Sequence, residues 1–170
     1  SLGGARPKAN VVDTDRSIYV AKFPSLKDDY DAGLWEHFCH LLAKSAGINA
    51  AETKVITTND KHHTLLSRRF DRTDDGKRIH FASAMTLLGL NDGDNATTGN
   101  GYLDIVDFII SGCTDVDANL RELFRRVAFN ICVGNSDDHF RNHGFLLTEK
   151  GWTLSPAYDM NPTLNEHQSL

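Results

Sequence analysis

The chain has 170 residues, of which 18 are Lys or Arg and 23 are Asp or Glu, so its formal net charge is −5. This acidic balance argues against direct, non-specific binding of nucleic acid or of anionic membranes, because both partners need clustered positive charge. No apolar run reaches the roughly 18 residues of a membrane span, and the three cysteines form no CxxC pair. We therefore expect a soluble domain in the reducing cytoplasm.

The first part of the chain predicts a strand, a helix and two further strands. Residues 17–22 are β-prone and follow a polar turn. Residues 31–46 repeat apolar side chains at helical spacing and predict an amphipathic helix that ends at Gly47. The apolar face of this helix consists of Leu34, Phe38, Leu41 and Leu42. Strands are then expected near 52–58 and 64–70.

The second part predicts three helices and two short strands. The helices are expected near 83–88, 102–111 and 117–133, and the strands near 144–148 and 152–154. The first two helices flank a loop rich in Gly, Asn and Asp at 91–101. The third helix carries a continuous apolar face and should be a central core helix that ends at Gly134. The whole pattern predicts a mixed α/β (α+β) architecture.

The densest polar cluster lies at 135–142, after the long helix and before the last two strands. Asp137 and Asn142 have the D-x-x-x-x-N spacing of the kinase catalytic loop, in which the Asp accepts a hydroxyl proton and the Asn holds a metal ion. Asp159 follows the last strand and is placed to bind the Mg²⁺ that bridges nucleotide phosphates. The order of these groups is the order that a phosphotransferase needs.

Phosphoryl transfer also needs a cation on the phosphates. Lys22, at the end of the first predicted strand, suits this role, and Glu36 on the following helix would fix the position of its ammonium group. Upstream, residues 1–9 contain two glycines and two cations, a composition that lets backbone N–H groups approach phosphate. The candidate phosphate contacts in this stretch are Gly3, Gly4, Ala5 and Lys8.

Six motifs in one order resemble the HipA-type serine/threonine kinases, the toxin halves of bacterial toxin–antitoxin pairs. The motifs are GGARPKA, IYVAKFP, WE followed by LLAK, RFDR, NSDDH followed by Asn142, and SPAYDM. The resemblance spans nearly the whole chain. It implies a two-lobe protein-kinase-like fold that uses ATP and Mg²⁺, with a small β-rich N-lobe over residues 1–73 and a partial helical C-lobe over residues 74–170.

The resemblance also implies a role for each matched residue. Asp137 would be the catalytic base, and Asn142 and Asp159 would be the metal ligands. Lys22 would contact the nucleotide phosphates, with its ammonium group oriented by Glu36. The protein would then transfer the γ-phosphate of ATP to a protein Ser or Thr.

Further expectations from the resemblance concern regulation and partners. His139 is placed with the nucleotide-binding residues; apart from the resemblance, we expect it to brace the catalytic loop through a hydrogen bond rather than to bind a metal. Ser1 falls where family members carry a serine whose autophosphorylation shuts the enzyme down. Family members phosphorylate a protein, in known cases an aminoacyl-tRNA synthetase, and a DNA-binding antitoxin restrains them. The family also has a subdomain before the glycines and a helical region after Asp159, so we expect this chain to be a fragment.

Two other functions remain open. The short C-lobe fits an inactive ATP-binding remnant that acts by protein contact. Carboxylate and imidazole groups together also suit a metal-dependent phosphohydrolase centre, and its candidate residues are Asp137, Asp138, His139, His143 and Asp159. A kinase moves phosphate to Ser or Thr, a hydrolase releases it without an acceptor protein, and a remnant binds ATP and does neither.

Overall fold

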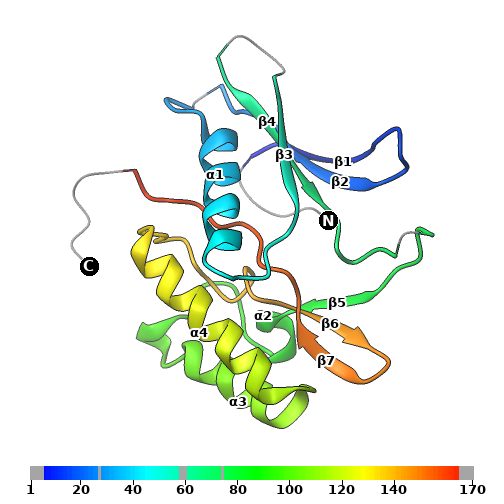
Figure 1. Cartoon of the computed structure of the whole chain (residues 1–170). Helices are drawn as coiled ribbons and strands as arrows, with labels where there is room; N and C mark the ends of the chain where they lie inside the picture. The colour runs from blue at the N-terminus through cyan, green and yellow to red at the C-terminus, as the bar shows by residue number, and fades with distance from the viewer. Residues whose placement is uncertain (1–5, 27, 58–60, 74, 165–170) are drawn as a thin grey trace.

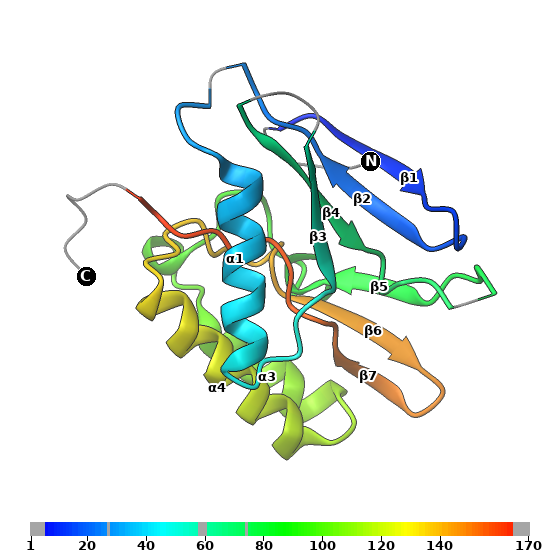
Figure 2. The ribbon, with the colours of Figure 1, turned by 45° about the horizontal axis from the view of Figure 1, so that its top comes forward.

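The computed structural model describes residues 6–26, 28–57, 61–73 and 75–164, and the first part of the chain forms an antiparallel sheet with one helix against it (Figure 1). The strands are β1 (Lys8–Val12), β2 (Ile18–Lys22), β3 (Thr53–Thr57) and β4 (His63–Arg68), in the order β1-β2-β4-β3. Helix α1 (Ala32–Ser45) packs against β3 and β4, and Figure 2 shows it lying across one face of the sheet. The expected helix and the three expected strands are therefore present.

Strand β1 is an element that the sequence prediction missed. None of its residues is fully buried, and Val12 at its end is 68% exposed. The strand exists because it pairs with β2 along its whole length, from Lys8 opposite Lys22 to Val12 opposite Ile18. The turn between the two strands is closed by the N–H of Asp13, which donates to the carbonyl of Ser17 at 2.9 Å.

Helix α1 begins and ends as predicted but presents the opposite face to the core. Asp31 caps its first turn by accepting from the N–H of Leu34 at 3.1 Å, and Gly47 follows it with a φ of 78°. The predicted apolar face lies outward: Leu34, Phe38, Leu41 and Leu42 are 40–50% exposed. The buried residues are instead Ala32, Glu36, Cys39, His40 and Ala43.

Small side chains explain why this face of α1 packs inward. A Cβ atom on Gly33 would lie 2.5 Å from the carbonyl oxygen of His63 in β4, so the backbones of helix and strand are close there. Such a close approach favours Ala and Gly on the inward side and leaves the larger apolar residues outside. We name the outward residues the exposed α1 stripe, which consists of Leu34, Trp35, Phe38, Leu41 and Leu42.

The second part of the chain combines three helices with a small antiparallel sheet. The helices are α2 (Ala84–Leu87), α3 (Tyr102–Gly112) and α4 (Val116–Cys132), and the strands are β5 (His80–Ser83), β6 (Gly144–Thr148) and β7 (Gly151–Leu154), in the order β5-β6-β7. A single 3-10 turn, η1 (Ala96–Thr98), lies in the predicted loop. Strand β5 was not expected from the sequence, because its partner β6 lies far along the chain.

Helix α4 is only partly the apolar core helix that the pattern predicts. Leu123 is buried, but Phe124 is 74% exposed. Three polar residues of α4 are buried with Leu123, namely Asn119, Arg126 and Asn130. The side-chain oxygen of Asn119 accepts from the N–H of Leu154 at 2.8 Å, which shows that α4 uses polar groups to hold neighbouring backbone.

The segment after β7 runs between α1 and α4 and joins the two parts of the molecule (Figure 2). The N–H of Ala157 donates to the carbonyl of Asn49 at 2.7 Å, and the N–H of Ala51 donates to the carbonyl of Ala157 at 2.9 Å. Ala157 and Met160 pack with residues of α1 and α4 in one apolar cluster. The segment around residues 157–160 is therefore held directly beside the first sheet.

Three aromatic rings add a second connection between the two parts. Phe70 follows β4, Phe81 lies in β5, and Tyr158 lies in the segment after β7, with ring centroids 5.6–6.0 Å apart. Gly144 gives the ring of Phe81 its space, because a Cβ atom there would lie 2.2 Å from that ring. No helix in the described part of the chain is long and apolar enough to cross a membrane.

Candidate functional site

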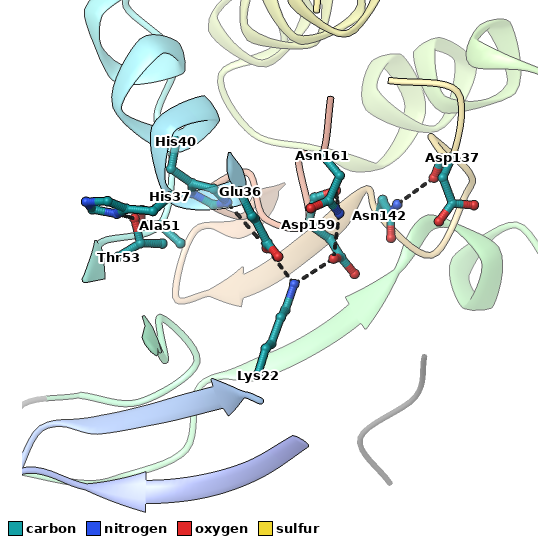
Figure 3. A network of polar contacts seen from close by, with 10 residues as sticks. All are labelled: Lys22, Glu36, His37, His40, Ala51, Thr53, Asp137, Asn142, Asp159 and Asn161. Carbon is teal, nitrogen blue, oxygen red and sulfur yellow. Dashed lines mark hydrogen bonds and ion pairs between the residues drawn. The ribbon is translucent and has the colours of Figure 1, made fainter. Parts of the chain in front are cut away.

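Lys22, the last residue of β2, is the centre of a polar network in which three distant segments meet (Figure 3). Its Nζ lies 2.5 Å from Oε1 of Glu36 in α1 and 2.6 Å from Oδ1 of Asp159 in the segment after β7. The side chains of Lys22 and Glu36 are only 12% and 3% exposed. The structure thus brings together three of the residues singled out from the sequence.

The cation of Lys22 stabilises the two carboxylates around it, whereas burial and the charge of Asp159 raise the pKa of Glu36 above its ordinary value. Burial alone would lower the pKa of Lys22, but attraction to Glu36 and Asp159 raises it above its ordinary value. Burial opposes ionisation of Asp159 as well, yet the charge of Lys22 and its hydrogen bond bring the pKa of that carboxyl below the ordinary range. Lys8 also lowers the pKa of Asp159 and lies opposite Lys22 in the β1–β2 pairing. The site therefore presents a fixed cation beside a carboxylate.

Asp159 has an unusual backbone conformation. Its φ of 58° is in the left-handed region, which Asp tolerates better than most residues. The side-chain amide of Asn161 donates to Oδ1 of Asp159 at 3.3 Å. Together with the backbone bonds of Ala157, these contacts aim the carboxylate of Asp159 at Lys22.

The predicted catalytic loop begins after α4 at Gly134, whose φ is 64°. Its fold is closed by Asn142, whose side-chain amide donates to the carbonyl of Asp137 at 2.9 Å and whose N–H donates to the carbonyl of His139 at 2.8 Å. The hydroxyl of Tyr158 donates to the carbonyl of Arg141 at 2.6 Å. The loop is thereby attached to the segment that carries Asp159.

Asn142 and Asp159 line the same small cavity, whereas Asp137 lies on the exposed surface of the loop. Carboxylate and amide oxygens are hard donors of the kind that Mg²⁺ prefers, and Mg²⁺ on a nucleotide needs few protein ligands because water and phosphate supply the rest. The donor set at this cavity therefore fits a magnesium ion.

Two residues behave differently from their sequence-based interpretation. His139 has its Nδ1 buried without a partner among the described residues, so its ring supplies no bracing hydrogen bond there. Asp138 entered the sequence analysis only as a possible hydrolase ligand. In the structure its carboxylate is buried and accepts hydrogen bonds from several side chains. The spacing to Asn142 had singled out Asp137, and no signal in the sequence indicated that Asp138 would be the buried one of the two.

Some of the predicted site residues lie outside the described part of the chain, and others lie within it. Ser1, Gly3, Gly4 and Ala5 lie outside the described residues, so their roles stay predictions. For the phosphohydrolase interpretation, no three His, Cys, Asp or Glu side chains within the described ranges gather as metal ligands would. His143 instead bonds Asp138 at 3.0 Å.

Relatives in sequence include proteins named as kinases. A putative kinase of Haemophilus influenzae is 25% identical over 177 aligned positions, which cover 94% of this chain and 51% of that protein. The serine/threonine-protein kinase toxin HipA of Shewanella oneidensis is 26% identical over 187 positions, covering 94% of this chain and 42% of the toxin. The chain thus spans about half the length, or less, of these curated relatives.

Solved structures with the same fold include a HipA toxin and a kinase. The Shewanella oneidensis HipA chain, solved in complex with HipB and operator DNA, matches 95% of this chain with a TM-score of 0.79 at 22% identity, over 43% of its own length. The proinflammatory kinase CtkA of Helicobacter pylori matches 90% of this chain with a TM-score of 0.70 at 17% identity, over 54% of its own length. These matches confirm the predicted kinase-like α/β fold.

A family model described as the HipA-like C-terminal domain matches residues 1–170, the whole chain. This match confirms the resemblance that the six sequence motifs carry. The chain belongs to the HipA-like C-terminal domain family.

Proposed function

We propose that this chain carries the nucleotide and phosphoryl-transfer site of an ATP-dependent protein serine/threonine kinase that requires Mg²⁺. The observation that carries the proposal is the convergence of Lys22, Glu36 and Asp159 from three segments, with Asp159 lining the same cavity as Asn142. This set combines a fixed cation with metal-binding oxygens, the two groups on which phosphoryl transfer depends.

In the proposed mechanism, Lys22 binds phosphate oxygens while Glu36 holds the ammonium group in place. An ammonium group has three N–H donors, so Lys22 can keep Glu36 as a partner while phosphate oxygens compete with Asp159. Asn142 and Asp159 would hold Mg²⁺. When bound, the ion neutralises negative charge that develops on the phosphates.

Asp137 is proposed as the group that takes the proton of the attacking Ser or Thr hydroxyl. Asp137 is exposed on the loop, where a protein substrate can reach it. Among the described residues, no side chain bonds its carboxylate, which leaves both oxygens available as acceptors. A positioned base of this kind contributes about 10²- to 10⁴-fold to the rate.

The biological setting is also a proposal, based on family likeness. Since the Shewanella HipA was solved with HipB and operator DNA, we infer that this chain belongs to the toxin of a toxin–antitoxin module and that an antitoxin with a DNA-binding domain restrains it. The substrate class is a protein, and an aminoacyl-tRNA synthetase is the first candidate to test.

The test is transfer of the γ-phosphate of labelled ATP to a protein acceptor, with each variant compared with wild type. Asp137→Asn should reduce transfer by about 10²-fold or more while nucleotide binding stays nearly unchanged. Asp159→Ala should also weaken Mg²⁺-dependent nucleotide binding. Asp117→Asn, an exposed substitution on α4, is the matched control and should behave as wild type.

Three results would contradict the proposal. Full transfer by Asp137→Asn would exclude this residue as the base. Phosphate release without any acceptor protein would favour the hydrolase, and binding of ATP·Mg²⁺ with neither reaction would favour the inactive remnant.

A further inference from the structure

Asp138, the residue after the proposed base, is bonded to three separate parts of the fold. Its side chain is 6% exposed. Oδ2 accepts from the hydroxyl of Tyr102 at the start of α3 at 2.6 Å and from the side-chain amide of Asn130 in α4 at 2.7 Å. Nε2 of His143, just before β6, lies 3.0 Å from Oδ1. A buried carboxylate with this many partners is a fixed point in the loop.

We propose that Asp138 is a positioning residue that holds both ends of the catalytic loop in their working geometry. This proposal rests on the proposed function of the loop. Asp138 is covalently joined to Asp137, and its partner His143 is covalently joined to Asn142. The buried contact between Asp138 and His143 therefore fixes the position of the proposed base relative to the proposed metal ligand.

The other two bonds attach this unit to the rigid helices. Tyr102 connects Asp138 to α3, and Asn130 connects it to α4. The ring of Tyr102 also packs edge-on against the ring of His143, with centroids 5.7 Å apart. Burial and the neighbouring Asp138 raise the pKa of Tyr102, so its hydroxyl keeps its proton and remains a donor.

The two adjacent aspartates thus divide the work of the loop. Asp138 lies inside, with its oxygens occupied by donors, and it lines the same cavity as Asn142 and Asp159. Asp137 lies outside, where the carboxylate can meet a substrate hydroxyl. Loss of a donor to Asp138 should therefore displace the reacting groups without touching the phosphate-binding pair Lys22 and Glu36.

Tyr102→Phe is the sharpest test, because it removes one hydroxyl and keeps the ring that packs on His143. We expect kcat for phosphoryl transfer to fall about tenfold, the effect of losing a hydrogen bond to a charged group. The KM for ATP should change by a smaller factor than kcat, since the proposed phosphate-binding pair Lys22 and Glu36 is not touched. Tyr19→Phe, which removes a tyrosine hydroxyl on β2, is the matched control and should leave kcat unchanged.

Hydrogen–deuterium exchange gives a readout that does not depend on activity. In Tyr102→Phe, the amides of residues 135–142 should exchange faster, whereas those of β2 and α1 should keep the wild-type rate. Asp138→Asn should show a larger effect of the same kind, because Asn lacks the charge that strengthens the three hydrogen bonds and has one acceptor oxygen where Asp has two.

Two outcomes would overturn the proposal. One is a normal kcat in Tyr102→Phe with normal exchange in the loop. The other is a lower melting temperature with uniformly faster exchange and no change in kcat, which would make Asp138 a purely structural residue. If wild type transfers no phosphate, the proposed function fails, and the exchange experiment still decides whether Asp138 fixes the loop.

Discussion

Replacing Lys22 with Met tests whether one buried cation holds the two parts of the molecule together. Met keeps much of the length and apolar contact of the lysine stem and removes the charge. Glu36, which is 3% exposed, then loses the cation that lies 2.5 Å from it. Asp159, which is 32% exposed, loses the same partner but can recover solvation from water.

The size of the effect follows mainly from Glu36. Removing one partner of a buried ion pair costs about 3–5 kcal/mol, because an uncompensated charge stays buried. For a domain of this length, each kcal/mol shifts the melting temperature by about 2–4 °C, so the melting temperature of Lys22→Met should fall by roughly 6–20 °C. Asp159 adds little, since a third of its side chain is exposed.

The measurement is thermal unfolding followed by circular dichroism, with urea unfolding as a check. The double variant Lys22→Met/Glu36→Gln should recover most of the lost stability, because the buried group is then a neutral amide. Lys150→Met, at an exposed turn, is the control and should change the free energy of unfolding by less than about 0.5 kcal/mol. A fall of less than about 2 °C in Lys22→Met, or no recovery in the double variant, would refute the reasoning.

Three further predictions concern the pH response, the packing and the surface. Burial would raise the pKa of Asp31, but hydrogen bonds from His63 outweigh it and hold this pKa below its ordinary 3.8. The ionised Asp31 therefore stabilises the folded protein above pH 3.8, and this stabilisation is lost as the pH falls through the lower pKa of the folded state. Asp31→Asn should flatten this loss in melts from pH 5 downward. Gly144→Ala should cost about 1–3 kcal/mol in urea unfolding, because the added Cβ meets the ring of Phe81. Phe38→Ser should cost about 1 kcal/mol, well below the roughly 3–5 kcal/mol of a core Phe, since the residue is 47% exposed and its ring packs edge-on against Trp35.

Each of these predictions has a contradicting result. If the melting temperature of Asp31→Asn falls with decreasing pH as steeply as that of wild type, the carboxylate of Asp31 does not contribute to the loss of stability in acid. A Gly144→Ala variant as stable as wild type would mean that the ring of Phe81 moves aside at little cost. A large loss in Phe38→Ser would place that ring in a packed environment.

The chain positions of most elements could be predicted from the sequence, because local signals set them. The helical spacing of apolar residues located α1, and Gly47 marked its end. Strands β1 and β5 were missed because their hydrogen bonds come from β2 and β6, and no local pattern records that pairing. Partners distant in sequence decide whether a short, weakly apolar run becomes a strand.

The direction in which α1 faces could not be predicted from its periodicity. The amphipathic rule assumes that apolar side chains point inward, whereas here Glu36 points inward and Leu34 and Phe38 point outward. Glu36 can be buried because Lys22 meets it, a contact between β2 and α1 that the rule does not include. The family resemblance did suggest that contact, and for this reason the site was anticipated better than the packing around it.

Helix α4 illustrates the same limit on the other side of the molecule. Its pattern predicted an apolar inward face, but Arg126 is buried there and donates to the carbonyl of Ser155 at 2.7 Å. The residues that hold the Asp159 segment in place are thus polar and inward. A hydropathy pattern reads such residues as solvent-facing, so it hides the groups that organise the site.

The exposed α1 stripe has a consequence for the colloidal behaviour of the protein. At pH 7 the net charge of −5 supplies electrostatic repulsion between molecules. Near the isoelectric point of about 5.8 that repulsion vanishes, while the stripe stays apolar. Self-association and precipitation should therefore be strongest in mildly acidic buffers of high salt. There the net charge is close to zero and salt screens the remaining charges, so little repulsion keeps the stripes of two molecules apart.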